Sequence, residues 1–258
     1  MKVYFVGAGP GAADLITLRG ARLLGSVRIV LYAGSLVPVE MLSHCAPDTE
    51  LLDTAQMDLE QQQACYVRAK EQDIDVVRLH SGDPAIYGAT AEQMRRLEAL
   101  DIEYEIVPGV SSFTAAAAAI GTELTKPEVS QSVILTRVSG RASAVPELES
   151  IARLAEHRAT MCIFLSGPHL KKIVTDLLLH YPPETPVSLV HRATWPEQRS
   201  YTGTLGTILE ETKRGAWNLT TMMLVGAALD KGIAAESSLY SKDFTHLFRV
   251  VKKNEEAA

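Results

Sequence analysis

The chain has 258 residues, of which 47% are hydrophobic and 22% charged, and its formal net charge is −6 at pH 7. Such a composition excludes a disordered or fibrous chain, and the length is enough for one large α/β domain or two smaller ones. The acidic balance argues against a general nucleic-acid-binding protein, which needs a basic face.

The amino-terminal segment enters a strand and a glycine turn at once and lacks the apolar region of a signal peptide, so we expect a cytoplasmic protein. No apolar run approaches the ~20 residues that cross a bilayer, so we expect no membrane partner. Cys45, Cys65 and Cys162 lie far apart, and the seven histidines show no zinc-binding spacing. We therefore expect neither a disulfide framework nor a metal held by the protein.

In the first half, short β-branched runs alternate with amphipathic stretches. Strands are predicted at residues 3–6, 27–32, 74–79 and 104–107, and helices at 15–24 and 91–100. This alternation predicts a mostly parallel sheet covered by helices. The polar segment 121–132 contains a proline and separates this half from the next, so we place a domain boundary there, with domains at 1–120 and 121–258.

The second half predicts another α/β domain, with more antiparallel pairing. Its predicted strands lie at 133–136, 160–165, 187–191, 199–202 and 222–225, and its predicted helices at 146–156, 170–180 and 204–213.

The first motif runs from Gly7 to Ala12 and satisfies the glycine pattern of dinucleotide-binding folds. Two features count against that interpretation. Pro10 lacks the backbone N–H that would bind a pyrophosphate, and the predicted strand 27–32 ends without the acidic residue that would hold ribose hydroxyls. A glycine-rich turn without a ligand remains an alternative.

Two further loops follow predicted strands. The segment 80–88 contains Gly82 and Asp83, and the segment 107–114 precedes a run of alanines at 115–119. In an open α/β sheet, ligands bind beyond the carboxyl ends of the strands, so the three loops together predict one shared pocket. The alternatives are that Asp83 caps the following helix and that the alanine run is a packing helix.

The same segments carry a family resemblance. GAGPG at 7–11, DLIT at 14–17, SGDP at 81–84 and PGVSS at 108–112 resemble the tetrapyrrole methylase family over nearly the whole chain. One departure is Ala12-Ala13, where relatives often have Asp-Pro. Residues 32–37, 80–88, 111–124 and 135–137 are most similar to family members that methylate C-11 of precorrin-4 or cobalt-precorrin-4.

The resemblance implies two α/β domains with a ligand cleft between them, usually in a homodimer, and S-adenosylmethionine as the methyl donor. Donor contacts carried over by position fall at the loops described above and at three points of the second domain: Pro10, Gly82, Asp83, Ile86, Tyr87, Ser111, Ser112, Leu165, Ala193 and Thr221. Core packing is an equal alternative for Leu165 and Ala193.

A sulfonium methyl is already electrophilic, so the enzyme's main task would be orientation, and no nucleophilic side chain is required. Asp83 is the predicted catalytic group, near the transferring methyl. The tetrapyrrole substrate of the family carries carboxylates, and basic side chains can bind them. The candidates for that role are Lys126, Arg137, Arg141 and Arg192.

Other functions stay open at this point. Another tetrapyrrole methylase, such as uroporphyrinogen III methyltransferase, would share the motifs. From different classes, a nicotinamide-dependent oxidoreductase would use the first motif, and a regulatory module would bind the donor without turnover.

Overall fold

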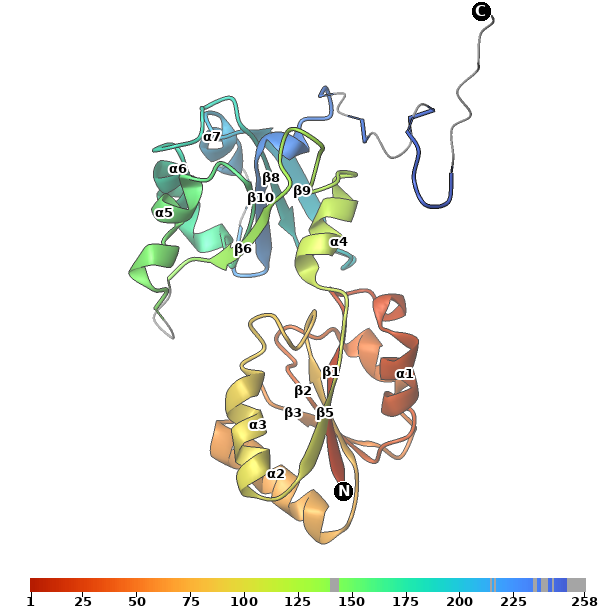
Figure 1. Ribbon diagram of the computed structural model, residues 1–258. Coiled ribbons are helices and arrows are strands. Elements are labelled where there is room, and N and C mark those ends of the chain that lie inside the picture. The colour runs from red at the N-terminus through yellow and green to blue at the C-terminus, as the bar shows by residue number, and fades with distance from the viewer. Residues whose placement is uncertain are drawn as a thin grey trace, which may run out of the picture.

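The computed structural model describes residues 1–139, 144–213, 215, 217–233, 236–237, 241–242 and 244–249. It has two lobes, each built on a five-stranded sheet with helices on both faces (Figure 1). The described part of the chain contains no helix long and apolar enough to span a membrane.

The amino-terminal sheet is entirely parallel, in the order β3-β2-β4-β1-β5. The helices α2 and α3 cover one face and α1 covers the other (Figure 1). The elements are β1 (Lys2–Gly7), α1 (Leu18–Leu24), β2 (Ile29–Tyr32), β3 (Glu50–Asp53), α2 (Leu59–Glu71), β4 (Val76–His80), α3 (Thr90–Ala99) and β5 (Glu103–Val107), with 3-10 turns at Ala13–Leu15 and Val39–His44.

The two faces of this sheet each carry a core. Side chains alternate along a strand, so Val3 and Phe5 pack beneath α2 and α3, whereas Val6 packs on the α1 side. Every residue of the central strand β4 is buried, as its continuous run predicts.

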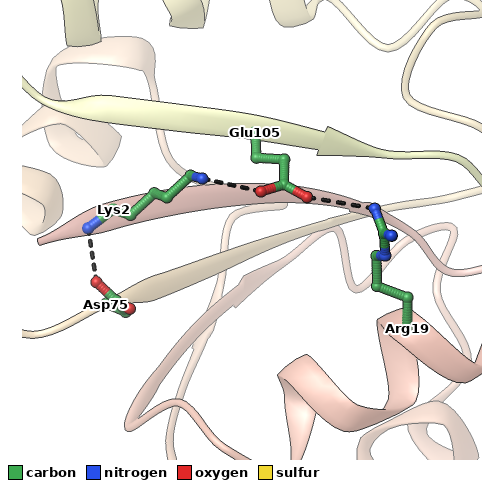
Figure 2. A network of polar contacts seen from close by, with 4 residues as sticks. All are labelled: Lys2, Arg19, Asp75 and Glu105. Atoms are coloured by element: carbon green, nitrogen blue, oxygen red, sulfur yellow. Dashed lines mark hydrogen bonds and ion pairs between the residues drawn. The ribbon is translucent and has the colours of Figure 1, made fainter.

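Polar contacts join the strands near the amino terminus (Figure 2). The backbone N–H of Lys2 donates to Asp75 at 2.6 Å, its Nζ donates to Glu105 at 2.8 Å, and Arg19 of α1 lies 3.5 Å from the same carboxylate. These groups are solvent-exposed or partly so, and such ion pairs contribute little to stability.

The carboxy-terminal sheet is mixed, in the order β6-β7-β10-β8-β9. Only the β6–β7 pair is parallel, and the other three pairs are antiparallel. Its elements are α4 (Ser112–Ala119), β6 (Val133–Arg137), α5 (Ile151–Ala155), β7 (Thr160–Phe164), α6 (Leu170–Leu177), β8 (Pro186–His191), β9 (Arg199–Thr204), α7 (Ile208–Thr212) and β10 (Thr221–Val225), with 3-10 turns at Glu147–Glu149, Gly167–His169 and Ala227–Leu229.

Helix α4 packs against the carboxy-terminal sheet. Its alanines Ala115, Ala116 and Ala117 are buried together with Cys162 of β7 and Leu224 of β10. The small side chains let the helix lie close to the sheet, in agreement with the packing interpretation of the alanine run. The sequence predicts a domain boundary after residue 120. Because α4 packs against the carboxy-terminal sheet, we propose that the boundary lies instead at 108–111, between β5 and α4.

Candidate functional site

The three glycine-containing loops meet at the carboxyl ends of β1, β4 and β5. Gly7, Gly82 and Gly109 are in direct contact there, because a Cβ on Gly109 would lie 2.2 Å from the Gly82 carbonyl oxygen and 2.7 Å from the Gly7 Cα. Two backbone hydrogen bonds between Gly9 and Gly82, of 3.2 and 2.8 Å, join the first two loops. No side chain fits on Gly7 or Gly109, so close approach requires glycine at both, whereas Gly82 is favoured by its φ of +65°.

Asp83 ties the second loop to the third. Its Oδ1 accepts a hydrogen bond from the backbone N–H of Ala85 at 2.7 Å, and its Oδ2 accepts one from Gly109 at 2.9 Å. The alternative that Asp83 caps the following helix is wrong, because the N-cap of α3 is Ala89 and no side chain caps it. The carboxylate therefore fixes the relative positions of two loops.

A cavity of about 290 Å³ lies between the lobes beside these loops. All ten residues predicted to contact the donor line it, from both lobes. The loop after β1 contributes Pro10, and the amino-terminal end of α4 contributes Ser112. The second lobe contributes strand ends and the residues that follow them, including Leu165, Ala193 and Thr221.

Several lining residues were not predicted from the sequence. They are Leu36, Ser81, Phe164, Val190, Trp195, Leu219, Thr220 and Met222. Four of them follow or end a strand, which is the signal that could have indicated them. The other four lie inside β8, directly before β10 or at its start, where the sequence carries no such signal.

Backbone strain is concentrated at the cavity. Tyr87, Leu165 and Arg192 line it and have φ angles of +54°, +55° and +48°, a region that residues other than glycine rarely adopt. Ala89 and Thr194, beside the lining residues, also have positive φ. Such conformations persist only where surrounding contacts fix them, and they are enriched at functional sites.

The four predicted substrate-binding residues are placed differently. Arg192 lines the cavity. Arg137 is not among the lining residues, but its guanidinium lies 6.0 Å from the ring of Tyr87, which is one of them. The same guanidinium donates to the carbonyls of Val138 and Ala144. Lys126 is not among the lining residues, and its Nζ donates to the carbonyl of Asp230. Arg141 lies outside the described residues.

Two histidines near the site are held in the neutral form. Burial, with a smaller contribution from the charge of Arg78, lowers the pKa of His80 to about 3. Burial also lowers the pKa of His191, and the guanidinium groups of Arg199 and Arg192 lower it further. Neither imidazole therefore supplies a proton at neutral pH. Within the described ranges, no group of three or more His, Cys, Asp or Glu side chains could hold a metal ion.

These features define a two-lobed α/β protein with a small-molecule pocket at the lobe junction. The chain matches the model of the tetrapyrrole (corrin/porphyrin) methylases over residues 2–209, and it belongs to this family. This confirms the resemblance and the predicted fold class.

Individual relatives are more similar still. The precorrin-4 C(11)-methyltransferase of Pseudomonas aeruginosa is 49% identical over 250 residues, which cover 96% of this chain and 99% of that protein. The crystal structure of a cobalt-precorrin-4 methyltransferase of cobalamin biosynthesis superposes with a TM-score of 0.86 at 42% identity, covering 89% of this chain and 96% of that one. A uroporphyrin-III C-methyltransferase of Thermus thermophilus, solved with S-adenosylhomocysteine, gives a TM-score of 0.74 at 27% identity, covering 89% and 93%.

The dinucleotide interpretation of residues 7–12 finds no support in the local structure. A dinucleotide pyrophosphate binds at the amino terminus of an α-helix that directly follows the glycines. Here a 3-10 turn at Ala13–Leu15 follows, and α1 begins only at Leu18.

Proposed function

We propose that this chain is an S-adenosylmethionine-dependent C-methyltransferase that methylates C-11 of precorrin-4 or of its cobalt complex in cobalamin biosynthesis. The observation that carries the proposal is the 49% identity to a precorrin-4 C(11)-methyltransferase over nearly the full length of both chains. The pocket between the lobes supports it, because all ten residues expected to contact the donor meet there.

The donor supplies a methyl group on a sulfonium, which needs no further activation. The chain's own contribution is to orient the two reactants, an effect that can lower a barrier by about 7 to 11 kcal/mol. In our proposal the backbone at Gly82 and Ser111 and the apolar side chains of Ile86 and Leu165 hold the donor. The cavity is lined by apolar groups with a few polar ones, as small-molecule sites are.

Asp83 has a positioning role in this proposal, because both of its oxygens already accept backbone hydrogen bonds. A direct catalytic role near the methyl group stays a prediction that the variants described below test.

The tetrapyrrole would lie beside the donor, with its carboxylates near Arg137 and Arg192. The second of these guanidinium groups lines the cavity and the first lies 6.0 Å from the ring of Tyr87, which also lines it. Guanidinium groups bind carboxylates through two parallel hydrogen bonds, which suits a substrate with several carboxylates. Arg141 is proposed for the same role, whereas the position of Lys126 gives it none.

We also propose that the protein forms a homodimer, as the family resemblance implies, and that it is cytoplasmic. Light scattering coupled to size-exclusion chromatography would give the oligomeric state directly, and a monomer at micromolar concentration would overturn this part of the proposal.

The decisive experiment is incubation of the purified protein with methyl-labelled donor and precorrin-4, with and without cobalt, followed by NMR of the product. We expect the label at C-11 in at least one of the two substrates. Uroporphyrinogen III serves as the comparison substrate. Labelling of that compound, with none of either precorrin-4 form, would overturn the proposal in favour of another tetrapyrrole methylase.

A binding measurement separates the remaining classes of function. A ligand at about 100 times its Kd adds ~2.7 kcal/mol of stability, so its binding raises the melting temperature. We expect a rise with S-adenosylhomocysteine and none with NADH. The opposite result would indicate an oxidoreductase, and donor binding without turnover on any tetrapyrrole would indicate a regulatory module.

A further inference from the structure

The loop that follows β8 reaches from the carboxy-terminal lobe to the glycine-rich loop of the amino-terminal lobe. The indole Nε1–H of Trp195 donates to the carbonyl of Pro10 at 3.0 Å. In the other direction, the backbone N–H of Ala12 donates to Thr194 Oγ1 at 3.0 Å. Two hydrogen bonds of opposite direction therefore join the lobes across three residues of the loop.

The residue between these bonds is enclosed by the same side chains. A Cβ on Gly11 would lie 2.3 Å from the Cδ1 atom of Trp195 and 2.9 Å from the Oγ1 atom of Thr194. The indole therefore packs directly on the backbone of Gly11, and this position requires glycine for that reason. We name Thr194 and Trp195, with their contacts to residues 10–12, the interlobe clamp.

The glycine-rich loop is fixed on its other side as well, by the hydrogen bonds between Gly9 and Gly82. Pro10 lines the cavity and follows Gly9 directly, so its position depends both on the Gly9–Gly82 hydrogen bonds and on the interlobe clamp. On the far side of the clamp, the guanidinium of Arg192 lies 5.0 Å from the ring of Trp195. Arg192, Trp195 and Pro10 all line the cavity, so the clamp connects two of its walls.

The backbone of the clamp is strained. Arg192 and Thr194 have φ angles of +48° and +71°, although neither is a glycine. Thr194 is β-branched, which makes a positive φ especially unfavourable. A conformation of this kind is retained only where other contacts over-determine it, and it is enriched at functional sites.

We propose that Thr194 and Trp195 are positioning residues for methyl transfer, which lock the glycine-rich loop to the second lobe and so set the width of the donor pocket between Pro10 and Arg192. This inference rests on the proposed function, because it concerns the affinity and orientation of the donor. If the loop leaves its place for part of the time, the apparent Kd rises in inverse proportion to the fraction of molecules with the loop in place.

Three variants test the clamp. Trp195→Phe keeps an aromatic ring but removes the N–H donor, and Thr194→Val keeps the shape of the side chain but removes the acceptor. Since each removes one neutral hydrogen bond, we expect the Kd for S-adenosylhomocysteine to rise by about two- to tenfold, with a matching rise in the donor KM. Thr194→Ser restores the hydroxyl and should return the Kd to within about twofold of the parent.

A spectroscopic readout follows from the tryptophan content. The chain has two tryptophans, so Trp217→Phe leaves Trp195 as the sole indole. Trp217 is not among the residues that line the cavity, and this variant should keep the parent's Kd and turnover. Its emission should change when S-adenosylhomocysteine is added, because Trp195 lines the pocket that the ligand enters.

The outcomes separate this inference from the proposed function. If the parent binds S-adenosylhomocysteine and methylates precorrin-4, but Trp195→Phe and Thr194→Val match it in Kd and turnover, the clamp has no positioning role. If Thr194→Ser is as impaired as Thr194→Val, the inference is also overturned, because the hydroxyl is then not the group that acts. If the parent neither binds the ligand nor transfers methyl groups, the proposed function fails, and the inference fails with it. Should Trp195→Phe not fold, the two Thr194 variants still decide the matter.

Discussion

Replacing Asp83 by asparagine tests how the pocket is held together. The carboxylate accepts one backbone hydrogen bond from Ala85 at 2.7 Å and another from Gly109 at 2.9 Å. An asparagine side chain has a single oxygen, so it can accept only one of the two, and its NH₂ group would face the other backbone N–H. The variant keeps the size of the side chain and removes the tie between the second and third loops.

The expected magnitude follows from the charge of the acceptor. A hydrogen bond to a charged group contributes about 1.5 to 3 kcal/mol net, and every 1.4 kcal/mol is about tenfold in an equilibrium constant. We therefore expect Asp83→Asn to weaken binding of S-adenosylhomocysteine by roughly ten- to a hundredfold if the loops separate without the carboxylate. If the loops stay in place, the same free energy is lost from the unfolding equilibrium instead.

Calorimetric titration with S-adenosylhomocysteine and urea unfolding, both at pH 7, measure the two quantities. A suitable control is Asp58→Asn, because Asp58 is the N-cap of α2 and asparagine caps helices about as well as aspartate. A drop in turnover with unchanged affinity and stability would show that Asp83 acts on the reacting methyl directly. Parental affinity, stability and turnover together would refute any role of this carboxylate at the site.

Three further predictions concern burial, close packing and charge. His80 has an ordinary pKa of 6.5 when unfolded and about 3 when folded, so the unfolded state alone gains a proton as the pH falls from 7 to 5. The free energy of unfolding should therefore fall by about 2 kcal/mol between pH 7 and pH 5 because of this histidine. Urea unfolding of His80→Leu should show no such fall. If the free energy of unfolding depends on pH equally in both proteins, the burial argument is wrong. Gly109→Ala should lower the free energy of unfolding by ~1 to 3 kcal/mol through overpacking, which thermal unfolding measures. The control Gly25→Ala should be nearly neutral, because a Cβ on Gly25 meets nothing closer than 3.4 Å. Arg137→Ala should raise the KM for the tetrapyrrole, whereas Lys126→Ala should leave it unchanged. If Lys126→Ala raises this KM and Arg137→Ala does not, the proposed position of the substrate is wrong.

The strands that run through the centre of each sheet were the easiest to predict. The run at 74–79 overlaps β4 over residues 76–79, and the run at 222–225 falls within β10. Every residue of both strands is buried, so a mostly apolar segment was enough to predict them. The edge strand β3 was not predicted, because three of its four residues are exposed and no apolar run marks it. Helix α2 was also missed, although Asp58 and Gln61 form a capping box that can be recognised in a sequence.

The candidate site, like the fold, could be predicted from the sequence only in part. The loops after β1, β4 and β5 could be predicted to meet, since the carboxyl ends of parallel strands share one edge of a sheet. Leu165, Ala193 and Thr221 entered only through the family resemblance, because no local pattern says how a second lobe docks on the first. Trp195 was not predicted for the same reason: its partner Pro10 lies 185 residues away in sequence. Lys126 was predicted from its charge alone, which carries no information on position.

The pocket is lined mostly by apolar residues and offers few reactive side chains, and this is consistent with the chemistry proposed for it. Transfer from a sulfonium needs orientation rather than a proton donor or a nucleophile, and burial keeps His80 and His191 neutral. The side chains of Asp83 and Thr194 accept hydrogen bonds from backbone N–H groups of the loops. Substitutions that alter the path of the backbone should therefore reduce turnover more than substitutions that shorten a lining side chain such as Ile86. A survey in which truncated lining residues were the most damaging class would point to side-chain chemistry that this geometry does not require.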